Sequence, residues 1–422
     1  MKETRFKQTE IGLIPEDWEI RKLGSIFKFI PNNTISRDNL VNQGTVMNVH
    51  YGDILIKYDS ILDIKNNEIP FINDSVISNS KFNEFAKDGD ILIADTAEDE
   101  MVCKATELYN IENRKLVSGL HTMWIRPITE FKPKYLGYFF NSTFYHNQIL
   151  PLIQGTKVCS VSKGAIKDTY ISIPLENEQN KIASALTSID NLLLSLDKLI
   201  EKKRLIKQGA MQELLTGKKR LPGFTGEWIE RRLGDMLTVK HGYPFKSEEY
   251  QRRGNFLIVT ISNVQDGYFE WGVGNYIDNI PYNLQRHQKL EIGDILVSLT
   301  GNIGRICKVD RKNCLLNQRV GVLRFTNDKL IDFIYYRLHH TDFIYSLYAQ
   351  SKGVAQQNIG SSEIEDFKFY MPSDINEVKA ISSIIKKIEA DIITIEKKRA
   401  KYEQIKQGMM QQLLTGKIRL IS

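Results

Sequence analysis

The chain has 422 residues, of which 42% are hydrophobic, 26% are charged and only 11 are proline. This composition excludes extended disorder, and the length suffices for about three domains of ~150 residues. The net charge of +6, from 57 basic and 51 acidic residues, is mild for this length. No apolar run approaches the ~20 residues of a membrane span, and the N-terminal segment MKETRFKQTE has no apolar signal core. We therefore expect a cytoplasmic protein that does not enter a membrane.

The cysteines are scattered along the chain at 103, 159, 307 and 314, without a CxxC pair. This spacing argues against a zinc cluster and against a disulfide scaffold. A reducing compartment fits it best.

The first part of the chain reads as a mixed α/β (α+β) domain over residues 1–175. Strand-like runs occur at 52–58 and 89–95, where the pentapeptide GDILI appears twice. An aromatic-rich run at 135–150 has helical spacing, which favours a buried helix.

Residues 176–220 predict a long central spacer helix. Its apolar residues recur at the 4, 3, 4, 3, 4 spacing of a coiled-coil seam, through Ile182, Leu186, Ile189, Leu193, Leu196 and Ile200. About 40 residues at ~1.5 Å per residue predict a rod of about 60 Å, which Thr216-Gly217 ends.

The second part repeats the first. A second α/β domain is expected over 221–373, with strand-like runs at 255–264, 293–300 and 319–325 and a helix-like run at 333–348. A C-terminal spacer helix is expected over 374–422, because KQGAMQELLTGKKRL at 207–221 recurs as KQGMMQQLLTGKIRL at 406–420, with 12 of 15 residues identical. Residues 178–221 and 374–422 each carry a net charge of +4, so the basic charge gathers in the two helices.

Two helices with matching seams predict an antiparallel coiled-coil spacer with pseudo-twofold symmetry. The alternative is that each helix packs separately on its own domain. Gly209 and Gly408 lie inside the helices, where each costs ~1 kcal/mol relative to alanine, and their recurrence predicts close packing of a neighbour.

We find no catalytic constellation in the sequence. The two Thr-Gly-Lys segments lack the glycine spacing of a phosphate-binding loop and are interpreted as helix caps. Asn279-Ile280-Pro281-Tyr282 lacks the first proline of the Asn-Pro-Pro-Tyr motif of DNA methyltransferases, and Asp366-Phe367-Lys368 has no upstream acidic partner for metal-nuclease chemistry.

Several strings resemble the DNA-specificity (S) subunit of type I restriction-modification systems. They are TEIGLIPEDWEIRKLGSIF at 9–27, IPLENEQNKIASAL at 173–186, LPGFTGEWIERRLGDML at 221–237, GDILVSLTGNIG at 293–304 and the two KQG helix ends. In the first domain, the acidic segment 96–100 replaces the TGNIG-like loop, and its carboxylates could accept hydrogen bonds from cytosine amino groups.

The resemblance implies a non-catalytic subunit that recognises double-stranded DNA. Each domain would read one half of a bipartite asymmetric target, and the helices would set the spacing. It further implies two methyltransferase (modification) subunits docked on the quasi-equivalent helix ends, together with motor/nuclease (restriction) subunits. No cofactor is expected on this chain, whereas S-adenosylmethionine, ATP and Mg are expected on the partners.

Base readers should be polar side chains on loops, with Arg, Lys, Asn and Gln best able to make paired contacts. The candidates in the first domain are Arg37, Lys57, Lys81, Lys157, Ser160 and Lys163. The candidates in the second domain are Lys246, Arg252, Arg253, Asn302, Arg305, Lys352, Gln356, Gln357 and Asn358.

Two other classes of function remain open from the sequence. One is a non-enzymatic adaptor with two protein-interaction domains, in which the helices serve only for dimerisation. The other is a fused restriction-modification enzyme, which the absence of methyl-donor and nuclease motifs disfavours.

Overall fold

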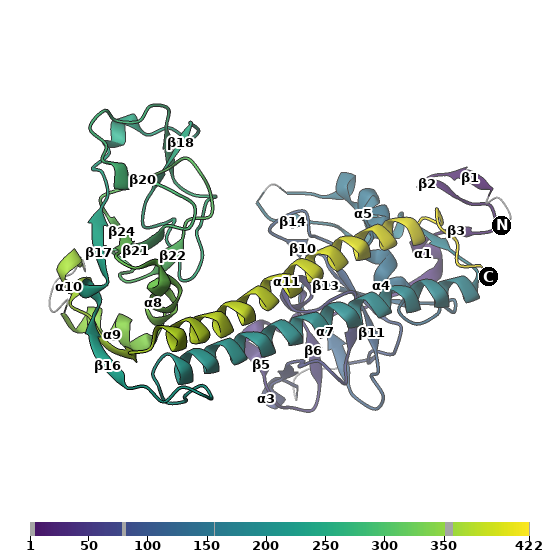
Figure 1. Ribbon diagram of the computed structural model, residues 1–422. Coiled ribbons are helices and arrows are strands. Elements are labelled where there is room, and N and C mark those ends of the chain that lie inside the picture. Colours follow the sequence, from purple (N-terminus) through teal and green to yellow (C-terminus); the bar gives the residue numbers. More distant parts are fainter. Residues whose placement is uncertain (1–4, 78–81, 156, 351–357, 422) are drawn as a thin grey trace. The chain divides into compact units, whose positions relative to one another are not determined.

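A computed structural model describes residues 5–77, 82–155, 157–350 and 358–421 (Figure 1). The chain divides into two compact units: unit 1 holds residues 1–197 and 397–422, and unit 2 holds residues 198–396. Each unit contains one α/β domain and one half of each long helix, α7 (Glu176–Leu214) and α11 (Ile375–Leu413). The predicted architecture of two mixed domains with two long helices is confirmed.

The domain of unit 1 is built on two small sheets. The five-stranded sheet has the order β4 (Phe27–Ile30), β13 (Thr122–Pro127), β9 (Ile91–Ala94), β11 (Ala105–Tyr109) and β7 (Ile61–Asp63). Its strands are antiparallel except for the pair of β7 with β11. The four-stranded sheet has the order β12 (Leu116–Ser118), β6 (Met47–Val49), β8 (Phe71–Ile72) and β5 (Leu40–Val41).

Short elements complete unit 1. The two-stranded pairs are β1 (Phe6–Thr9) with β2 (Gly12–Pro15), β3 (Glu19–Lys22) with β15 (Tyr170–Ile173), and β10 (Thr96–Ala97) with β14 (Cys159–Ser160). The helices are α1 (Leu23–Ile26), η1 (Arg37–Asn39), α2 (Tyr51–Ile56), α3 (Asp74–Ile77), α4 (Tyr135–Phe140), α5 (Thr143–Ile149), η2 (Leu150–Leu152) and α6 (Lys163–Lys167).

The domain of unit 2 repeats this plan. One sheet has the order β17 (Leu237–His241), β24 (Val320–Phe325), β21 (Ile295–Ser298) and β22 (Ile306–Lys308). The other has the order β19 (Asn275–Ile277), β18 (Phe256–Val259), β23 (Cys314–Leu316) and β20 (Lys289–Leu290), and β16 (Trp228–Arg232) pairs with β25 (Lys368–Pro372). The helices are η3 (Leu233–Asp235), η4 (Ser247–Glu249), η5 (Arg286–Gln288), η6 (Asp328–Leu330), α8 (Ile331–Arg337), α9 (Thr341–Gln350) and α10 (Ser361–Glu365).

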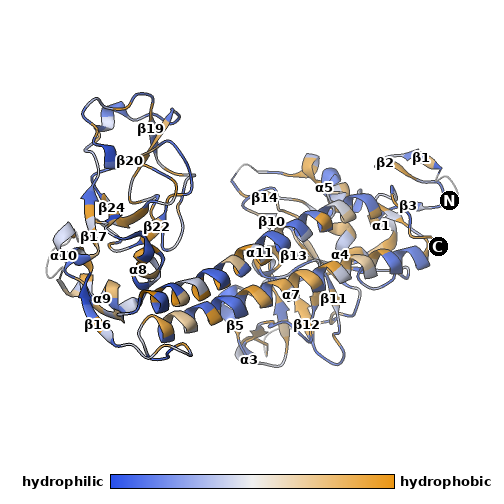
Figure 2. Ribbon diagram, in the orientation of Figure 1, coloured by the Kyte–Doolittle hydropathy of each residue, from blue (hydrophilic) through white to orange (hydrophobic). Residues whose placement is uncertain are grey.

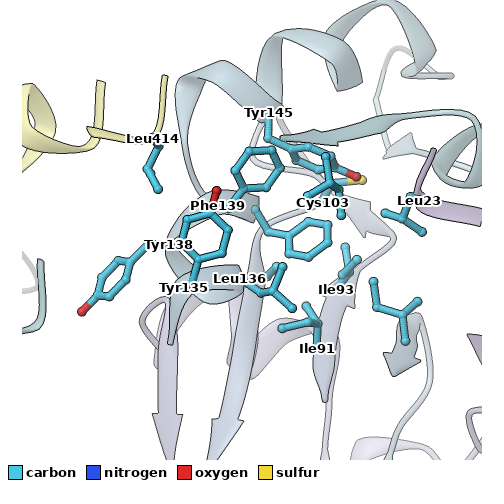
Figure 3. Close-up of a cluster of buried hydrophobic side chains, with 14 of the residues drawn as sticks. Leu23, Ile91, Ile93, Cys103, Tyr135, Leu136, Tyr138, Phe139, Tyr145 and Leu414 are labelled. Atoms are coloured by element: carbon cyan, nitrogen blue, oxygen red, sulfur yellow. The ribbon is translucent and has the colours of Figure 1, made fainter. Parts of the chain in front are cut away.

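The cores contain residues of both the domain and the long helices. In unit 1 the buried aromatic side chains of α4 and α5 pack on β9, and Leu414, which follows α11, belongs to the same cluster as Tyr138 and Phe139 (Figure 3). In unit 2 the residues Leu214 and Leu215 at the end of α7 join the core of the second domain. The helix end that completes the first domain is therefore remote from it in sequence, whereas the one that completes the second domain directly precedes it.

The two long helices run antiparallel within each unit. In unit 1, Asp190 and Asp197 on α7 pair with Lys406 and Arg399 on α11, so that the order along one helix is reversed on the other. In unit 2, Lys203 pairs with Asp391 at 2.7 Å, and Lys207 pairs with Glu389. Hydrophobic and hydrophilic residues alternate along both helices (Figure 2). The predicted antiparallel pairing is confirmed, and the predicted seam is largely buried at Ile182, Leu186, Leu193, Leu196 and Ile200.

A buried carboxylate joins the start of α7 to the end of the chain. Glu178, which is 1% exposed, accepts hydrogen bonds from Trp18 Nε1 at 2.9 Å and from Nε and Nη2 of Arg419, both at 2.8 Å. Its Oε1 also accepts from the backbone N–H of Leu420 at 3.2 Å. These bonds fix the C-terminal segment against unit 1, and they raise the pKa of Arg419.

Unit 2 contains the counterpart of this cluster. Glu377, also fully buried, accepts from Nε and Nη2 of Arg220 at 2.7 and 2.8 Å. Trp228 takes the place of Trp18, but its indole N–H is buried without a hydrogen-bond partner among the described residues. Gly217 has a φ of 72°, as the predicted helix cap requires, and a Cβ there would come within 3.0 Å of the Trp228 ring.

The structure contradicts two predictions from the sequence. Residues 51–56 form helix α2 rather than a strand, because His50 Nδ1 accepts from the N–H of Gly52 and caps a first turn. Gly209 and Gly408 have no described atom within 4 Å of where a Cβ would stand, so neither glycine serves close packing inside the chain.

Candidate nucleic-acid interface

The strands of unit 1 end together along one edge of the domain. Antiparallel pairing places Thr122, the first residue of β13, opposite Ala94, the last residue of β9. The parallel strands β6 and β12 also end side by side, with Val49 opposite Ser118. The segments that follow these strands therefore meet on one side of the domain, which we call loop edge 1 (residues 31–36, 50–53, 95–100 and 119–121).

Side-chain amides connect the segments of loop edge 1. Asn33 Nδ2 donates to Asn48 Oδ1 at 2.7 Å and to the carbonyl oxygen of Ser118 at 2.9 Å. Asn32 donates to the carbonyl oxygen of Gly119 at 3.2 Å. A Cβ on Gly119 would lie 2.7 Å from Asn48 Nδ2, so only glycine fits this close approach.

An acid–imidazole pair occupies the centre of loop edge 1. Asp95 Oδ1 accepts from Thr96 Oγ1 at 2.9 Å and lies 3.3 Å from His121 Nδ1. The backbone of Asp95 is held on both sides. Its N–H donates to the carbonyl oxygen of His121, and its carbonyl oxygen accepts from the N–H of Val161. The pair is built on rigid strand ends and still reaches solvent, with 21% of the Asp95 side chain and 49% of the His121 side chain exposed.

Aromatic rings flank this pair. The ring of Tyr51 meets the ring of His121 edge-on, at 5.5 Å between centroids, and lies 4.5 Å from the ring of His50. Burial lowers the pKa of His50, so this imidazole stays neutral as it caps α2. Loop edge 1 thus combines amides, a carboxylate, an imidazole and an aromatic ring, all of which can contact bases.

Unit 2 has the same edge with different side chains. Val320, the first residue of β24, lies opposite Ser298, the last residue of β21, and β18 and β23 end side by side. The segments 242–250, 260–268, 299–305 and 317–319 therefore meet, and we call them loop edge 2. Here Arg305 Nη1 donates to Gln265 Oε1 at 2.6 Å, and Gln318 and Arg319 are exposed.

The candidate residues of the first domain lie in two groups. Ser160 pairs with Thr96 in the β10–β14 ladder, and Lys163 Nζ donates to Asn32 at 3.4 Å, so both border loop edge 1. Arg37 and Lys57 pair with the buried carboxylate of Asp53, the last residue of the 50–53 segment of the same edge, at 2.7 and 3.2 Å. Lys157 is exposed in the segment before β14, and Lys81 lies outside the described residues.

The candidate residues of the second domain are similarly divided. Asn302 and Arg305 belong to the segment after β21, and Asn358 bridges to Thr300 beside them. Lys246, Arg252 and Arg253 are exposed around η4. Lys352, Gln356 and Gln357 lie outside the described residues.

The residues at the centres of both edges could not be picked out from the sequence of either domain alone. Asp95, Thr96, His121 and Arg319 were not candidates, because each adjoins a buried strand and carries no loop signature of its own. The signal that could have found them is the repeat: aligning the two domains on β13 and β24 places His121 and Arg319 at the same position.

The lysines of the two KQG segments are used inside the chain. Lys207 pairs with Glu389, which also accepts from Tyr336 Oη at 2.9 Å. In unit 1, Lys406 pairs with Asp190 at 2.7 Å. Burial acts to raise the pKa of Glu389, but the hydrogen bond and the charge of Lys207, together with the hydrogen bond from Tyr336, outweigh it and hold the pKa below its usual value. These lysines therefore fix each helix to its neighbour.

The exposed part of each KQG segment is a different face. On α7 it consists of the exposed Leu205, Gln208 and Gln212 and the half-buried Gly209, which recur at 3, 4 and 7 residues. On α11 the same positions hold Gln404, Gln407, Gly408 and Gln411. We call these the KQG faces. A cavity of about 690 Å³ lies beside the first, lined by Gln208, Gln212, Tyr268, Tyr335 and Ile393 among others.

No metal centre accompanies these surfaces in the part of the chain that the structure describes, since no three His, Cys, Asp or Glu side chains gather there as metal ligands. Nor does any described helix combine the length and the apolarity that crossing a membrane requires.

Comparison with known proteins gives consistent matches. The family model described as the type I restriction modification DNA specificity domain matches residues 15–207 and again residues 225–407. The MjaX specificity subunit of a type I restriction enzyme from Methanocaldococcus jannaschii is 27% identical, covering 99% of this chain and 98% of its own. The MjaVIII specificity subunit from the same organism is 24% identical, with coverages of 99% and 97%.

Solved structures share the fold. The S subunit of a type I restriction-modification system from M. genitalium aligns with a TM-score of 0.54 at 16% identity, over 94% of this chain and 96% of that one. A chain from a study of complex assembly and conformational transition of the type I R-M system aligns with a TM-score of 0.59 at 17% identity, over 96% and 99%.

Proposed function

Because the chain belongs to the type I restriction modification DNA specificity family, we propose that it selects the DNA sequence on which a multi-subunit restriction-modification complex acts. It is a specificity subunit with two recognition domains, one for each match of the family model. The adaptor alternative is not favoured, because the relatives that this chain matches over nearly their full length are specificity subunits.

The chemistry of the two loop edges supports reading of an asymmetric, bipartite target. The same backbone frame carries Asp95 and His121 in unit 1 but Leu299 and Arg319 in unit 2. Side chains of such different hydrogen-bonding character prefer different bases. Each domain would thus read its own short block, and the base pairs between the blocks would go unread.

We assign no catalysis to this chain, and its action would depend on partners in the cytoplasm. Residues 1–177 carry a net charge of −3, and phosphate neutralisation supplies most of the non-specific affinity for DNA. The domain in unit 1 should therefore bind DNA weakly until methyltransferase subunits complete the grip on the duplex. Motor/nuclease subunits would join the same complex.

Selection of bound sequences from random duplexes tests this function. With a methyltransferase partner present, we expect two conserved blocks separated by a constant unread gap, and without the partner a much weaker enrichment. Duplex libraries with each block randomised in turn serve as the control. A chain that enriches no sequence in either condition would contradict the assignment as a DNA reader.

The KQG faces are where we propose that the methyltransferase subunits dock. Each face has a glycine with open space around it, the exposed Gly408 on α11 and the half-buried Gly209 on α7. A partner helix could approach the backbone closely at these positions. The two faces are equivalent by the repeat, which fits two copies of one partner.

Replacing both Gly209 and Gly408 by alanine should change the stability of the helices and the binding of the methyltransferase in opposite directions. Since each new methyl group meets nothing in the chain, we expect the helices to gain about 1 kcal/mol at each site. The melting temperature should rise, whereas methyltransferase binding, measured by calorimetry, should weaken. Ser188→Ala, which is exposed on α7 away from the KQG face, is the control. Unchanged binding of the double variant would show that the partner docks elsewhere.

A further inference from the structure

One backbone position is equivalent in the two loop edges and carries opposite chemistry. The N–H of Asp95 donates to the carbonyl oxygen of His121 at 3.1 Å, and the N–H of Leu299 donates to that of Arg319 at 3.1 Å. Next to these, Thr96 pairs with Ser160, and Thr300 bridges to Asn358. The residues that immediately precede β13 and β24 are therefore structurally matched to each other.

In unit 1, this position is prepared for polar contact outside the chain. Asp95 uses Oδ1 for Thr96 and His121, and no hydrogen bond from the described residues reaches its Oδ2. Likewise, no described residue bonds to Nε2 of His121, whose ring is held by Tyr51 and by Asp95. One acceptor and one ring nitrogen thus remain available at the centre of loop edge 1.

The backbone of His121 is strained, and the strained residue lies at the matched position. Its φ is 52°, in the left-handed region, where a non-glycine residue costs about 1–2 kcal/mol. Loop edge 1 keeps an imidazole here although glycine would relieve this strain.

In unit 2, the matched side chain is a free cation. Arg319 is exposed, its backbone N–H donates to Asn317 Oδ1 at 3.2 Å, and its guanidinium forms no ion pair or hydrogen bond within the described chain. Leu299 replaces the aspartate and is buried, so no carboxylate competes for this guanidinium. By contrast, Arg305 in the same edge is already bonded to Gln265.

We propose that this matched position is the principal base-reading position of both domains, with Arg319 contacting guanine in one half-site and the Asp95–His121 pair contacting cytosine in the other. The inference rests on the proposed function. An arginine donates two hydrogen bonds to O6 and N7 of guanine, whereas a carboxylate accepts from the N4 amino group of cytosine. The difference between the two domains at one position is then what makes the two half-sites different.

Three substitutions test the proposal in the complex with its methyltransferase. Arg319→Gln should lower discrimination at one base pair of one half-site by about 10- to 100-fold, and Asp95→Asn should do so in the other half-site and shift its preference toward adenine. His121→Asn keeps a residue that tolerates positive φ and should weaken the same base pair as Asp95→Asn. The measurement is selection of bound duplexes, followed by affinities for single-base variants.

Each control removes a charge of the same sign at the side of the domain opposite to its loop edge, Lys312→Gln for Arg319→Gln and Glu68→Gln for Asp95→Asn. Lys312→Gln lies in the turn between β22 and β23, and Glu68→Gln lies between β7 and β8; both side chains are exposed. Neither control should alter either half-site.

Two results would overturn the proposal. A uniform loss of affinity for all sequences, with a lower salt dependence, would make Arg319 a phosphate contact. Unchanged half-sites for Asp95→Asn and His121→Asn, with melting temperatures as in the wild type, would remove the pair from base reading. Both outcomes differ from failure of the proposed function, in which the wild-type complex itself would select no bipartite sequence.

Discussion

Replacing Glu178 by alanine is expected to destabilise unit 1 by about 1.5–3 kcal/mol, because Arg419 loses two charge-assisted hydrogen bonds and keeps only its ion pair with Asp17, at 2.8 and 2.9 Å. The substitution also removes the acceptor for the Trp18 indole and for the N–H of Leu420. Hydrogen exchange localised to unit 1 measures the effect, since unfolding of a chain with two units need not be two-state. Deleting residues 418–422, which removes Arg419 itself, should give a loss of the same order.

The tryptophans supply a matched comparison. Trp18→Phe breaks the hydrogen bond to Glu178, whereas Trp228→Phe removes a buried N–H that has no partner among the described residues. We expect the first to cost about 1–3 kcal/mol and the second to be nearly neutral. Equal losses from the two substitutions would mean that the Trp18 hydrogen bond contributes nothing.

A fragment of residues 1–221 is expected to form a symmetric dimer. It contains the first domain, all of α7 and the segment that matches the C-terminal end of the chain, including Arg220, the equivalent of Arg419. Arg220 of one copy can thus bond to Glu178 of the other, and Leu214 and Leu215 can take the places of Leu413 and Leu414. Because a twofold protein reads a twofold site, the dimer with methyltransferase should select an inverted repeat of one half-site.

Sedimentation and sequence selection check this expectation. The control is the same fragment with Arg220→Ala, which should dimerise far more weakly because Glu178 would stay buried and unpaired. A fragment that remains monomeric at micromolar concentration, or that still selects the asymmetric target, would contradict the equivalence of the two helix ends.

The long helices and their pairing were predictable because repetition and periodicity are both properties of the sequence itself. Two copies of one seam specify a partner as well as a helix, and the structure buries the predicted seam. Four of the five strand-like runs contain strands. A short apolar run is recognisable from the sequence alone, and in these four cases the run is buried in a sheet.

The pentapeptide GDILI shows where such reasoning ends. At 89–93 its residues Ile91–Ile93 begin strand β9, where Asp90 accepts from Trp124 and Arg126. At 52–56 it forms helix α2, where Asp53 is bound by Arg37 and Lys57. Identical residues take both structures because their surroundings differ: Asp90 is bound by the distant Trp124 and Arg126, whereas at 52–56 the cap from His50 and the pair of Asp53 with Lys57 accompany a helix.

The centres of the loop edges escaped prediction for a related reason. Asp95 and His121 are 26 residues apart in sequence and meet only because β9 and β13 are paired. The roles of the KQG lysines also depend on distant residues, since Lys207 pairs with Glu389 and Lys406 with Asp190.

The closure of unit 1 by the C-terminal segment also determines the order in which the protein can mature on the ribosome. Residues 1–197 emerge first, but Met410, Leu413 and Leu414 of the same core emerge last, after the whole of unit 2. At about 5–20 residues per second, the apolar face of α7 at Ile182 and Leu186 waits roughly 10–40 s for its cover. During that interval the tail of a neighbouring nascent chain can supply the missing residues. The first domain is thus synthesised before the second but completed after it, and C-terminal segments could be exchanged between chains on one polysome.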